Sequence, residues 1–451
     1  PTRAGGFDQK IAIIGAGPAG LSCAFYLAEK GYKPVVFEKN ERPGGMLTYG
    51  IPSFKLQKDV IEAEVEVIRL MGAEFRYGVE VGRDVTLDEL RAQGFKAFYV
   101  AIGCQGGRLA GIPGEDAEDV TVAVDFLREV NSGKIDALPG RTIVVGGGNV
   151  AIDVARNACR LGSEHVEMFC LESEAQMPAS EEERREAIED GVHISCGWGP
   201  KEVHLDEAGH VRGITFKRCT RVFDDEGRFA PEYDENDLRR VDADRVVMSI
   251  GQSIVWGDLL AGSKVELGRG QGALADPQTY QTAEPDIFVG GDVYTGPSFA
   301  IDAIAAGHEA AVSIHRLVQP GSTLTIGRNQ RRYTALDRDD VVIESYDNAS
   351  REVAHVDRER EKAAPFSEYV ETFTEEQVRA ETARCLGCGA SIVDPNKCIG
   401  CGLCTTKCAF DAIHLDRDRP ECSTMVKYEQ KLPSLGKYAL KRAIKIKFGR
   451  K

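Results

Sequence analysis

The fold of this chain is decided by residues 10–38, which read KIAIIGAGPAGLSCAFYLAEKGYKPVVFE. Residues 11–14 form an apolar run that predicts a short buried strand, and residues 15–20 (GAGPAG) predict a turn. Residues 21–30 carry apolar side chains every three to four positions, which is typical of a helix. Strand, glycine turn and helix follow one another in the order that binds an adenine dinucleotide, with the pyrophosphate at the free N–H groups of the helix.

Three glycines of this turn each have a distinct role in such a site. Gly15 permits the tight turn, Gly17 lets the backbone approach a pyrophosphate, and Gly20 lets the helix pack closely on the strand. A second apolar run at 34–37 ends in Glu38, whose carboxylate is placed to accept hydrogen bonds from a ribose 2′-OH. The sequence therefore predicts a complete βαβ unit rather than an isolated glycine turn.

Length and composition set further limits. With 451 residues the chain is too long for one core, which predicts two to four domains. It contains no apolar run of the roughly 18 residues that span a membrane and no signal-peptide pattern, so we expect a cytoplasmic protein. A net charge of −15 argues against nucleic acid as a partner. The chain begins at Pro1 rather than at methionine, as a processed or trimmed segment of a longer protein would.

The opening pattern recurs in the middle of the chain. Residues 142–145 predict a strand, GGGN at 146–149 a turn, and 150–161 a helix. The next predicted strand, 165–170, ends shortly before Glu172. Two such units predict two nucleotides, and a protein that holds two is better suited to moving a hydride between them than to storing them.

Small residues extend these sites. Gly45 lies in the segment PGGMLTYGIPSFKL, where paired glycines let the backbone lie close against a flat ligand. Predicted strands at 95–102 and 245–250 end at Gly103 and Gly251, positions that face the cofactor crevice of a parallel sheet.

The chain then returns to the first domain. A predicted strand at 286–289 is followed by Gly291 and Asp292, and a carboxylate at this place suits a polyol chain. A helix is predicted to begin within 297–304, and its positive N-terminal end would favour negative charge on a reduced flavin ring. This order of features favours a flavin at the first site.

Residues 10–317 resemble the small-subunit flavoprotein of glutamate synthase and its relatives, which include the large subunit of NADH-dependent ferredoxin:NADP transhydrogenase and the reductase half of dihydropyrimidine dehydrogenase. The segments that carry the resemblance are GAGPAG, PGGMLTYGIPSFKL, VVGGGNVAIDVAR, QMPAS and PDIFVGGD. They occur in the order in which the family has them and together span about two thirds of the chain.

The resemblance implies FAD on the first domain and a nicotinamide nucleotide on the second. The residues expected around FAD are Gly15, Gly17, Pro18, Ala19, Gly20, Glu38, Lys39, Gly45, Met46, Gly103, Gly291, Asp292 and Ala303. The residues expected around NAD are Gly146, Gly148, Asn149, Val150, Glu172 and Gly251. No catalytic side chain is expected, because the cofactors themselves transfer hydride and electrons.

Two departures from the family pattern matter. In its NADPH-binding members the strand before the Met-Pro motif ends in two arginines that would clamp a 2′-phosphate, and here these positions are Leu171 and Glu172. A carboxylate repels a phosphate dianion and binds a free 2′-OH, so we expect NAD(H) rather than NADP(H). The family's cysteine-rich segment ahead of the FAD domain is absent, and cysteines gather at the other end.

Seven of the 13 cysteines lie in the last seventy residues of the chain. Four of them are separated by two, two and three residues, the spacing with which ferredoxins bind a 4Fe-4S cluster. Zinc seldom uses four cysteines this tightly spaced, which favours the iron-sulfur interpretation. One residue departs from the ferredoxin pattern, because Ala409 stands where ferredoxins usually carry proline. The expected cluster ligands are Cys398, Cys401, Cys404 and Cys408.

Three clustered cysteines remain, namely Cys385, Cys388 and Cys422. Two complete 4Fe-4S clusters need eight thiolates, so a second cluster would need a non-cysteine ligand or one from a partner. A zinc site built from the same three thiols with His414 or an outside group is the alternative. We expect a second metal centre at these residues, and their spacing leaves the metal open.

The predicted architecture is α/β, with two Rossmann-like dinucleotide-binding domains and a small C-terminal ferredoxin-like iron-sulfur domain, the FAD domain being interrupted by the NAD(P)H domain. Residues 326–373 are rich in charge and predict an extended linker or a surface-wrapping arm. The expected divisions are the FAD domain at 1–115 and 282–325, the NAD(P)H domain at 116–281, the linker at 326–373, the iron-sulfur domain at 374–425 and a basic tail at 426–451.

These features predict an NAD(P)H-oxidising FAD and iron-sulfur oxidoreductase subunit that exchanges electrons with a partner subunit or a ferredoxin, with an electron-bifurcating complex as one setting. The alternatives are a glutamate-synthase-type small subunit feeding a large chain, a stand-alone NADH:ferredoxin oxidoreductase, and a structural or sensing subunit that merely binds nucleotides. The basic tail predicts either a frayed end or an arm that docks onto an acidic partner subunit.

Overall fold

The computed structural model describes residues 5–328, 349–385, 398–407, 413–415 and 427–448. The chain divides into two compact units, Pro1–Ile326 with Asn348–Arg384 and Gly327–Asp347 with Cys385–Lys451. The first unit contains both of the predicted glycine turns, and the second contains the clustered cysteines.

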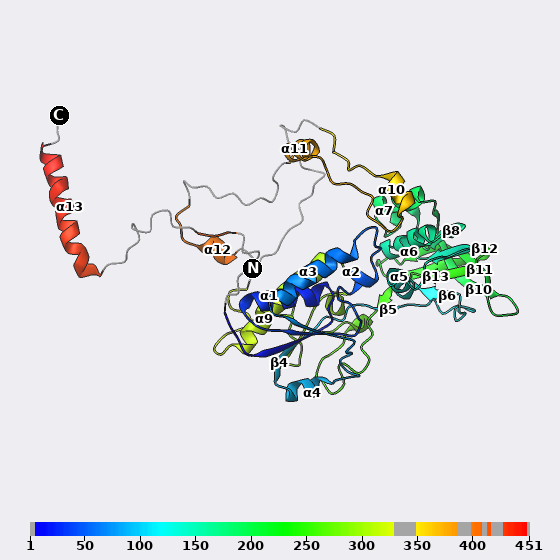
Figure 1. The fold of residues 1–451 in the computed structure, drawn as a ribbon, viewed down its shortest axis with the longest axis horizontal. Coiled ribbons are helices and arrows are strands. Elements are labelled where there is room, and N and C mark those ends of the chain that lie inside the picture. The colour runs from blue at the N-terminus through cyan, green and yellow to red at the C-terminus, as the bar shows by residue number, and fades with distance from the viewer. Residues whose placement is uncertain (1–4, 329–348, 386–397, 408–412, 416–426, 449–451) are drawn as a thin grey trace. The chain divides into compact units, whose positions relative to one another are not determined.

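The first half of unit one is a five-stranded parallel sheet in the order β15-β4-β1-β2-β3. Figure 1 shows that helices cover both faces of this sheet. Its strands are β1 (Lys10–Ile14), β2 (Val35–Glu38), β3 (Glu74–Tyr77), β4 (Phe95–Val100) and β15 (Ile287–Val289). Successive side chains of a strand point to opposite faces of its sheet. Alternate residues of β1 therefore belong to two different hydrophobic cores, one on each face. Ile11 and Ile13 pack with the helices of one face, and Ala12 and Ile14 pack with those of the other.

The helices of this half divide between the two faces of its sheet. α1 (Pro18–Lys30), α3 (Lys58–Leu70) and α9 (Ala300–Val318) contribute to the core around Ile11, and α4 (Leu87–Ala92) contributes to the core around Ala12. Two short helices follow glycines, α2 (Met46–Tyr49) and α8 (Asp292–Thr295). The predicted strand, turn and helix at 10–38 are thereby confirmed.

The chain returns to the first half earlier than the predicted boundary at residue 281. Leu259 and Ala273 are only 3% and 2% exposed, and they belong to the same core as Ala12 and Ile14. The chain passes from the first half to the second after β4 and returns after β13. The two connecting segments pair with each other as a short antiparallel ladder of β5 (Gly106–Gly107) and β14 (Gln252–Ser253). The segment after β14 therefore packs with the first sheet and not with the second.

The second half is built on another five-stranded parallel sheet, in the order β6-β13-β7-β8-β9. Its strands are β6 (Val120–Val122), β7 (Arg141–Val145), β8 (His165–Cys170), β9 (His193–Cys196) and β13 (Arg245–Met248). One face packs on α5 (Ala123–Asn131), α6 (Asn149–Arg160) and α7 (Glu181–Glu189). The predicted recurrence of strand, glycine turn and helix is confirmed by β7 and α6.

The other face of this sheet is covered by three antiparallel strands that the sequence did not lead us to expect. They are β10 (Trp198–Leu205), β11 (Val211–Phe223) and β12 (Phe229–Val241). Phe216 of β11 stacks on Phe169 of β8, with 3.9 Å between ring centroids. Two 3₁₀ turns, Glu174–Gln176 and Arg269–Gln271, complete the body of the unit.

Residues 349–384 form an arm that packs on the second half. The arm contains α10 (Arg358–Ala363) and α11 (Glu375–Ala383), and the Thr374 side chain caps the start of α11. Tyr369 is buried, and the Arg160 side chain of α6 donates a hydrogen bond to the Pro365 carbonyl. The described part of the charged segment is therefore a surface-wrapping arm and not an extended linker.

The second unit contains α12 (Leu403–Lys407) and α13 (Tyr428–Phe448) among its described residues. α13 is exposed and carries most of the basic tail, so the tail is helical where the structure describes it. Within the described ranges, every helix is too short or too polar to cross a membrane.

Candidate functional site

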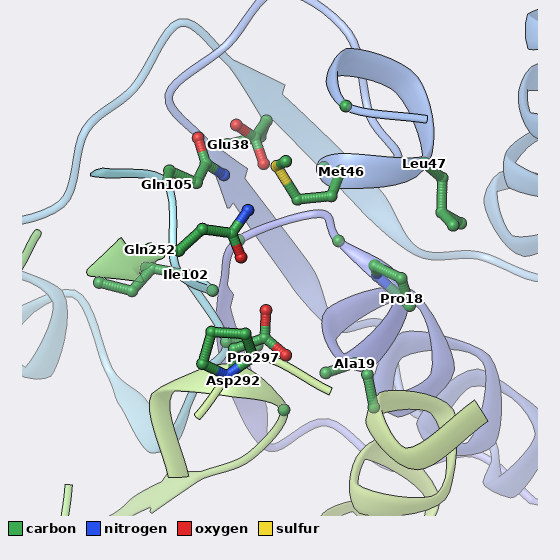
Figure 2. Close-up of a pocket in the computed structure, with 18 of the residues that line it drawn as sticks. Pro18, Ala19, Glu38, Met46, Leu47, Ile102, Gln105, Gln252, Asp292 and Pro297 are labelled. Atoms are coloured by element: carbon green, nitrogen blue, oxygen red, sulfur yellow. The ribbon is translucent and has the colours of Figure 1, made fainter. Parts of the chain in front are cut away.

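A cavity of about 1480 Å³, counting its solvent-open part, extends between the two halves of unit one (Figure 2). From the first half it is lined by the first glycine turn, the end of β2 and the residues after β15. From the second half it is lined by Leu127 of α5 and by Val150 and Asp153 of α6. Ligands held by the two glycine turns could therefore meet in this cavity.

The cavity is lined by every residue predicted around FAD except Gly20. Gly20 instead lies where α1 crosses β1, and a Cβ atom there would overlap the Gly15 carbonyl. This close approach agrees with the packing role expected of the third glycine. A Cβ atom on Gly45 would stand 2.9 Å from the Gly17 Cα atom, so two backbone segments meet without side chains at the turn. The cradle is shaped for a ligand that approaches backbone directly.

Glu38 lies at the carboxyl end of β2 and is 3% exposed. Its Oε2 atom accepts a hydrogen bond from the Ala16 N–H at 2.8 Å, and its Oε1 atom accepts from the Asn40 N–H and the Asn40 Nδ2 atom at 2.9 and 2.7 Å. The carboxylate is thereby fixed to the glycine turn, and Figure 2 shows it at the cavity. A carboxylate oxygen has two acceptor sites, so Oε2 keeps capacity for a ligand hydroxyl.

Asp292 borders the cavity in the same view, with Pro297 beside it (Figure 2). Burial raises the pKa of its carboxyl group above the ordinary aspartate value. The Cys104 thiol contacts the Asp292 carbonyl at 3.7 Å, and burial raises the pKa of this thiol to about 12. Because a thiolate is the reactive form of cysteine, Cys104 is a packing residue rather than a redox thiol.

The second glycine turn is tied to the QMPAS segment. The Asn149 Oδ1 atom accepts a hydrogen bond from the Ser180 N–H at 3.0 Å, and the Gly147 carbonyl accepts one from the Ala179 N–H at 2.9 Å. These bonds fix the loop after β8 against the start of α6. Among the residues predicted around NAD, Val150 lines the cavity, and the others lie outside its lining.

Glu172 follows β8 and is half-buried beside the second turn. A Cβ atom on Gly147 would stand 3.0 Å from its Oε2 atom, which places the carboxylate beside the second glycine turn. Gly251 follows β13 and is exposed, and a Cβ atom on it would lie 3.6 Å from the Arg108 side chain. Glu172 and Gly251 both lie outside the lining of the cavity.

Several cavity residues were missed by sequence reasoning. Gln105 and Gln252 lie beside the β5 and β14 pair and face the cavity in Figure 2, and Leu127 reaches it from α5. None of these residues belongs to a motif. Asp153 stood in the recognised segment VVGGGNVAIDVAR, and its helical position three residues after Val150 could have placed it on the same face.

The described cysteines of the second unit are Cys385, Cys398, Cys401 and Cys404, and all four are exposed. Gly400 and Gly402 adopt φ angles of +67° and +76° between the last three, which curls the backbone there. Among the described residues, no three side chains of cysteine, histidine, aspartate or glutamate gather into a metal site. Cys388, Cys408 and Cys422 lie outside the described residues. Cysteine thiolates separated by two residues are usual ligands of iron-sulfur clusters, so Cys398, Cys401 and Cys404 fit such a cluster in residue type and spacing.

Comparison with known proteins gives two family matches. The model described as pyridine nucleotide-disulphide oxidoreductase matches residues 9–307, and the model described as 4Fe-4S binding domain matches residues 391–414. The first match covers both glycine turns and the cavity, and the second covers the predicted cluster ligands.

Three relatives illustrate the range of similar proteins. The NADP(+)-dependent formate dehydrogenase subunit beta of Moorella thermoacetica is 36% identical over 399 residues, which are 84% of this chain and 54% of that protein. The glutamate synthase (NADPH) small chain of Escherichia coli K12 is 36% identical over 325 residues, 68% of each chain. The NADPH-Fe(3+) oxidoreductase subunit beta of Geobacter sulfurreducens is 31% identical over 423 residues, 84% of this chain and 61% of that one. The chain thus spans little more than half of the first relative.

Solved structures agree on the fold. FprA of Mycobacterium tuberculosis in complex with NADPH aligns with a TM-score of 0.59 at 19% identity and covers 69% of this chain and 84% of that one. The thioredoxin reductase of Lactococcus lactis aligns with a TM-score of 0.54, also at 19% identity, covering 69% of this chain and 99% of that one. Both alignments show the same fold over about two thirds of this chain.

Proposed function

This chain belongs to the pyridine nucleotide-disulphide oxidoreductase family and carries a 4Fe-4S binding domain, and from that premise we propose that it is the NADH-oxidising FAD and iron-sulfur subunit of a larger redox complex. The observation that carries the proposal is the cavity shared by the two halves, with Glu38 and Asp292 on one side and Val150 and Asp153 on the other. A hydride can pass between two cofactors only if both reach one shared space, and residues of both halves line this cavity.

In this proposal the first half holds FAD. The N–H groups at the start of α1 face its pyrophosphate, and Glu38 accepts a hydrogen bond from its ribose. Asp292 accepts hydrogen bonds from the polyol chain, and the glycine contact between Gly17 and Gly45 leaves room for the ligand. FAD supplies, when bound, an acceptor for a two-electron hydride that can pass electrons on singly.

The second half holds the nicotinamide nucleotide, with its pyrophosphate at Gly146, Gly148, Asn149 and the N-terminus of α6. We propose NADH rather than NADPH, because the half-buried carboxylate of Glu172 lies beside the second glycine turn, where it would repel a 2′-phosphate and accept a hydrogen bond from a free 2′-OH. The relatives named above are called NADP- or NADPH-dependent, and another relative is the NAD-dependent dihydropyrimidine dehydrogenase subunit PreT of Escherichia coli K12. Glu172 is therefore the residue on which the proposed preference depends.

The second unit would carry electrons onward. Cys398, Cys401, Cys404 and Cys408 would hold a 4Fe-4S cluster, since their spacing lies inside the match to that domain. We assign a second metal centre to Cys385, Cys388 and Cys422, with a fourth ligand from elsewhere. In a reducing compartment such as the cytosol, thiols stay reduced and can bind a metal.

The terminal acceptor or donor would be another protein. Relatives bear names such as subunit beta and small chain, which supports assembly with further redox subunits, and a ferredoxin is the simpler alternative. The direction of electron flow depends on the reduction potentials of the cofactors, which the residues around each cofactor help to set.

A spectrum of the purified chain tests the proposal. We expect flavin bands with a broad iron-sulfur shoulder, and NADH added without oxygen should bleach both. If neither NADH nor NADPH changes the flavin bands of the loaded protein, the chain is a nucleotide-binding structural subunit instead.

A further inference from the structure

Residues 355–371 of the arm form a closed loop, called here the strap. At its base the Asp357 N–H donates to the Tyr369 carbonyl at 2.9 Å, and the Glu371 N–H donates to the His355 carbonyl at 2.8 Å. α10 stands between these two ends, and the Asp357 side chain caps it by accepting from the Arg360 N–H at 3.0 Å. The strap is therefore an ordered structure with its own backbone closure rather than a loose connector.

Two buried arginines of α6 hold the strap to the second half. The Arg156 side chain is 1% exposed, and its Nη2 atom donates to the Tyr369 hydroxyl at 2.6 Å while its Nε atom donates to Asp190 at 2.7 Å. Arg160 donates from Nη2 to Glu361 of α10 at 2.7 Å. A buried charge that loses a partner is costly, so the strap and α6 are expected to move together.

The same arginines hold a loop of the first half. Phe54 lies in the segment PGGMLTYGIPSFKL and is 3% exposed, and its ring centroid lies 4.0 Å from the Arg160 Cζ atom and 5.0 Å from that of Arg156. The Gln57 Nε2 atom donates to the Phe366 carbonyl of the strap at 3.3 Å. A guanidinium packed over an aromatic face is attracted to the ring electrons, and the attraction is stronger when both groups are buried away from water. Phe54 is thereby packed against α6 and the strap, two elements that lie far from it along the chain.

Lys55 extends this contact to the rim of the cavity. Its Nζ atom donates to Asp153 Oδ1 at 2.6 Å and also pairs with Glu183 of α7. Asp153 is the fifth residue of α6 and lines the cavity, and Gly50 and Ile51 line it from the first half just before the loop. The loop at 53–57 thus connects the cavity wall of the first half with that of the second.

We propose that the strap clamps the loop at 53–57 onto α6 and so positions the two nucleotide sites for hydride transfer, with Phe54, Lys55 and Tyr369 as positioning residues. This inference rests on the proposed function for its kinetic consequence but not for the clamp itself. The wall residues of the two halves face one cavity in the clamped state, so this state is the one in which the two ligands can meet. Loosening the clamp should slow transfer without removing either binding site.

Two variants of the full chain test the clamp, Tyr369→Phe and Tyr369→Ala. The first removes the hydroxyl that accepts from Arg156, and the second removes the ring as well. Tyr438→Phe is the matched control, because Tyr438 on the exposed α13 also accepts a hydrogen bond from an arginine, Arg442 at 3.2 Å. Rapid mixing with NADH gives the rate constant of flavin bleaching at saturation and the Kd of NADH separately.

We expect Tyr369→Ala to lower the saturating rate constant roughly 10-fold to 100-fold, Tyr369→Phe to lower it less, and both to keep FAD content and the Kd of NADH near wild type. A misplacement of bound reactants acts on the rate and not on the affinity. A rate constant that is unchanged or raised in Tyr369→Ala overturns the proposal, as does an equal loss in Tyr438→Phe.

Hydrogen–deuterium exchange separates the clamp from the proposed function. Exchange of the backbone amides at 53–57 should rise in both Tyr369 variants and stay at the wild-type level in Tyr438→Phe, whether or not any nucleotide reduces the flavin. Unchanged exchange at 53–57 overturns the clamp even if NADH reduces the wild-type protein. If exchange rises while the wild-type flavin is inert to both nucleotides, the clamp stands and the proposed function fails.

Discussion

The backbone of Gly45 lies against Gly17 so closely that a Cβ atom on Gly45 would stand 2.9 Å from the Gly17 Cα atom. Gly45 also has a φ of +55°, which disfavours any side chain. We therefore expect Gly45→Ala to lose most of its FAD, measured as the ratio of flavin to protein absorbance after purification. Gly78→Ala is the control, since Gly78 has a similar φ of +68° but open space around it. Full flavin content in Gly45→Ala would contradict the assignment of this contact to the FAD site.

Nucleotide preference should depend on Glu172. Replacing this carboxylate by a cation in Glu172→Arg removes repulsion of a 2′-phosphate and supplies a partner for it. We expect the ratio of kcat/KM for NADPH to that for NADH to rise at least about 10-fold. Glu174→Arg, two residues further along and exposed, should leave the ratio unchanged. The proposal of NADH fails if the wild-type protein is more efficient with NADPH.

Stability should depend on pH through Asp153. Burial raises the pKa of Asp153 to about 6, and Lys55 opposes the rise only in part. Because the pKa of Asp153 is higher in the folded state than in the unfolded state, the protonated carboxyl group stabilises the fold relative to the ionised one. This contribution to the free energy of unfolding is fully present below about pH 4 and is lost as the pH rises through about 6. Relative to Asp153→Asn, the wild-type free energy of unfolding should fall by roughly 3 kcal/mol across that window. Urea unfolding at several pH values measures the difference, and parallel curves would speak against a raised pKa.

Metal analysis should separate the two cysteine sets. With one 4Fe-4S cluster the chain should contain about four iron atoms, and Cys401→Ser should lose them. Cys385→Ser should lower the remaining iron or the zinc, whichever the second centre holds. Cys159→Ser, in the first unit, is the control and should change neither. Iron and zinc contents that are unaffected by Cys385→Ser would show that the second centre does not exist.

The local parts of the site could be predicted from the sequence. A strand, a glycine turn, a helix and a terminal acid are neighbours along the chain, and their chemistry is set by residue type, so β1, α1 and the position of Glu38 followed from residues 10–38. The same reasoning worked for β7 and α6. Glu172 was placed beside its turn for the same reason.

The parts that depend on distant contacts could not be predicted. β12 reads FAPEYDENDLRRV, and because most of its residues are exposed and six of its 13 are charged, no apolar alternation marks it as a strand. Phe54 and Lys55 looked like residues of an ordinary loop, since their partners on α6, α7 and the strap are far away in the chain. The boundary at 281 was placed too late because Leu259 and Ala273 show their burial only in the folded core.

In the proposed function, electrons pass from the nucleotide through FAD in the shared cavity to the iron-sulfur site. Rapid mixing of the loaded chain with NADH in the absence of oxygen, followed at flavin and iron-sulfur wavelengths, tests this sequence of steps. We expect the flavin bands to bleach first and the iron-sulfur absorbance afterwards, and we expect Cys401→Ser to keep the first phase and lose the second. Iron-sulfur bleaching that precedes the flavin phase, or a flavin phase without any later one in the wild-type chain, would contradict the account.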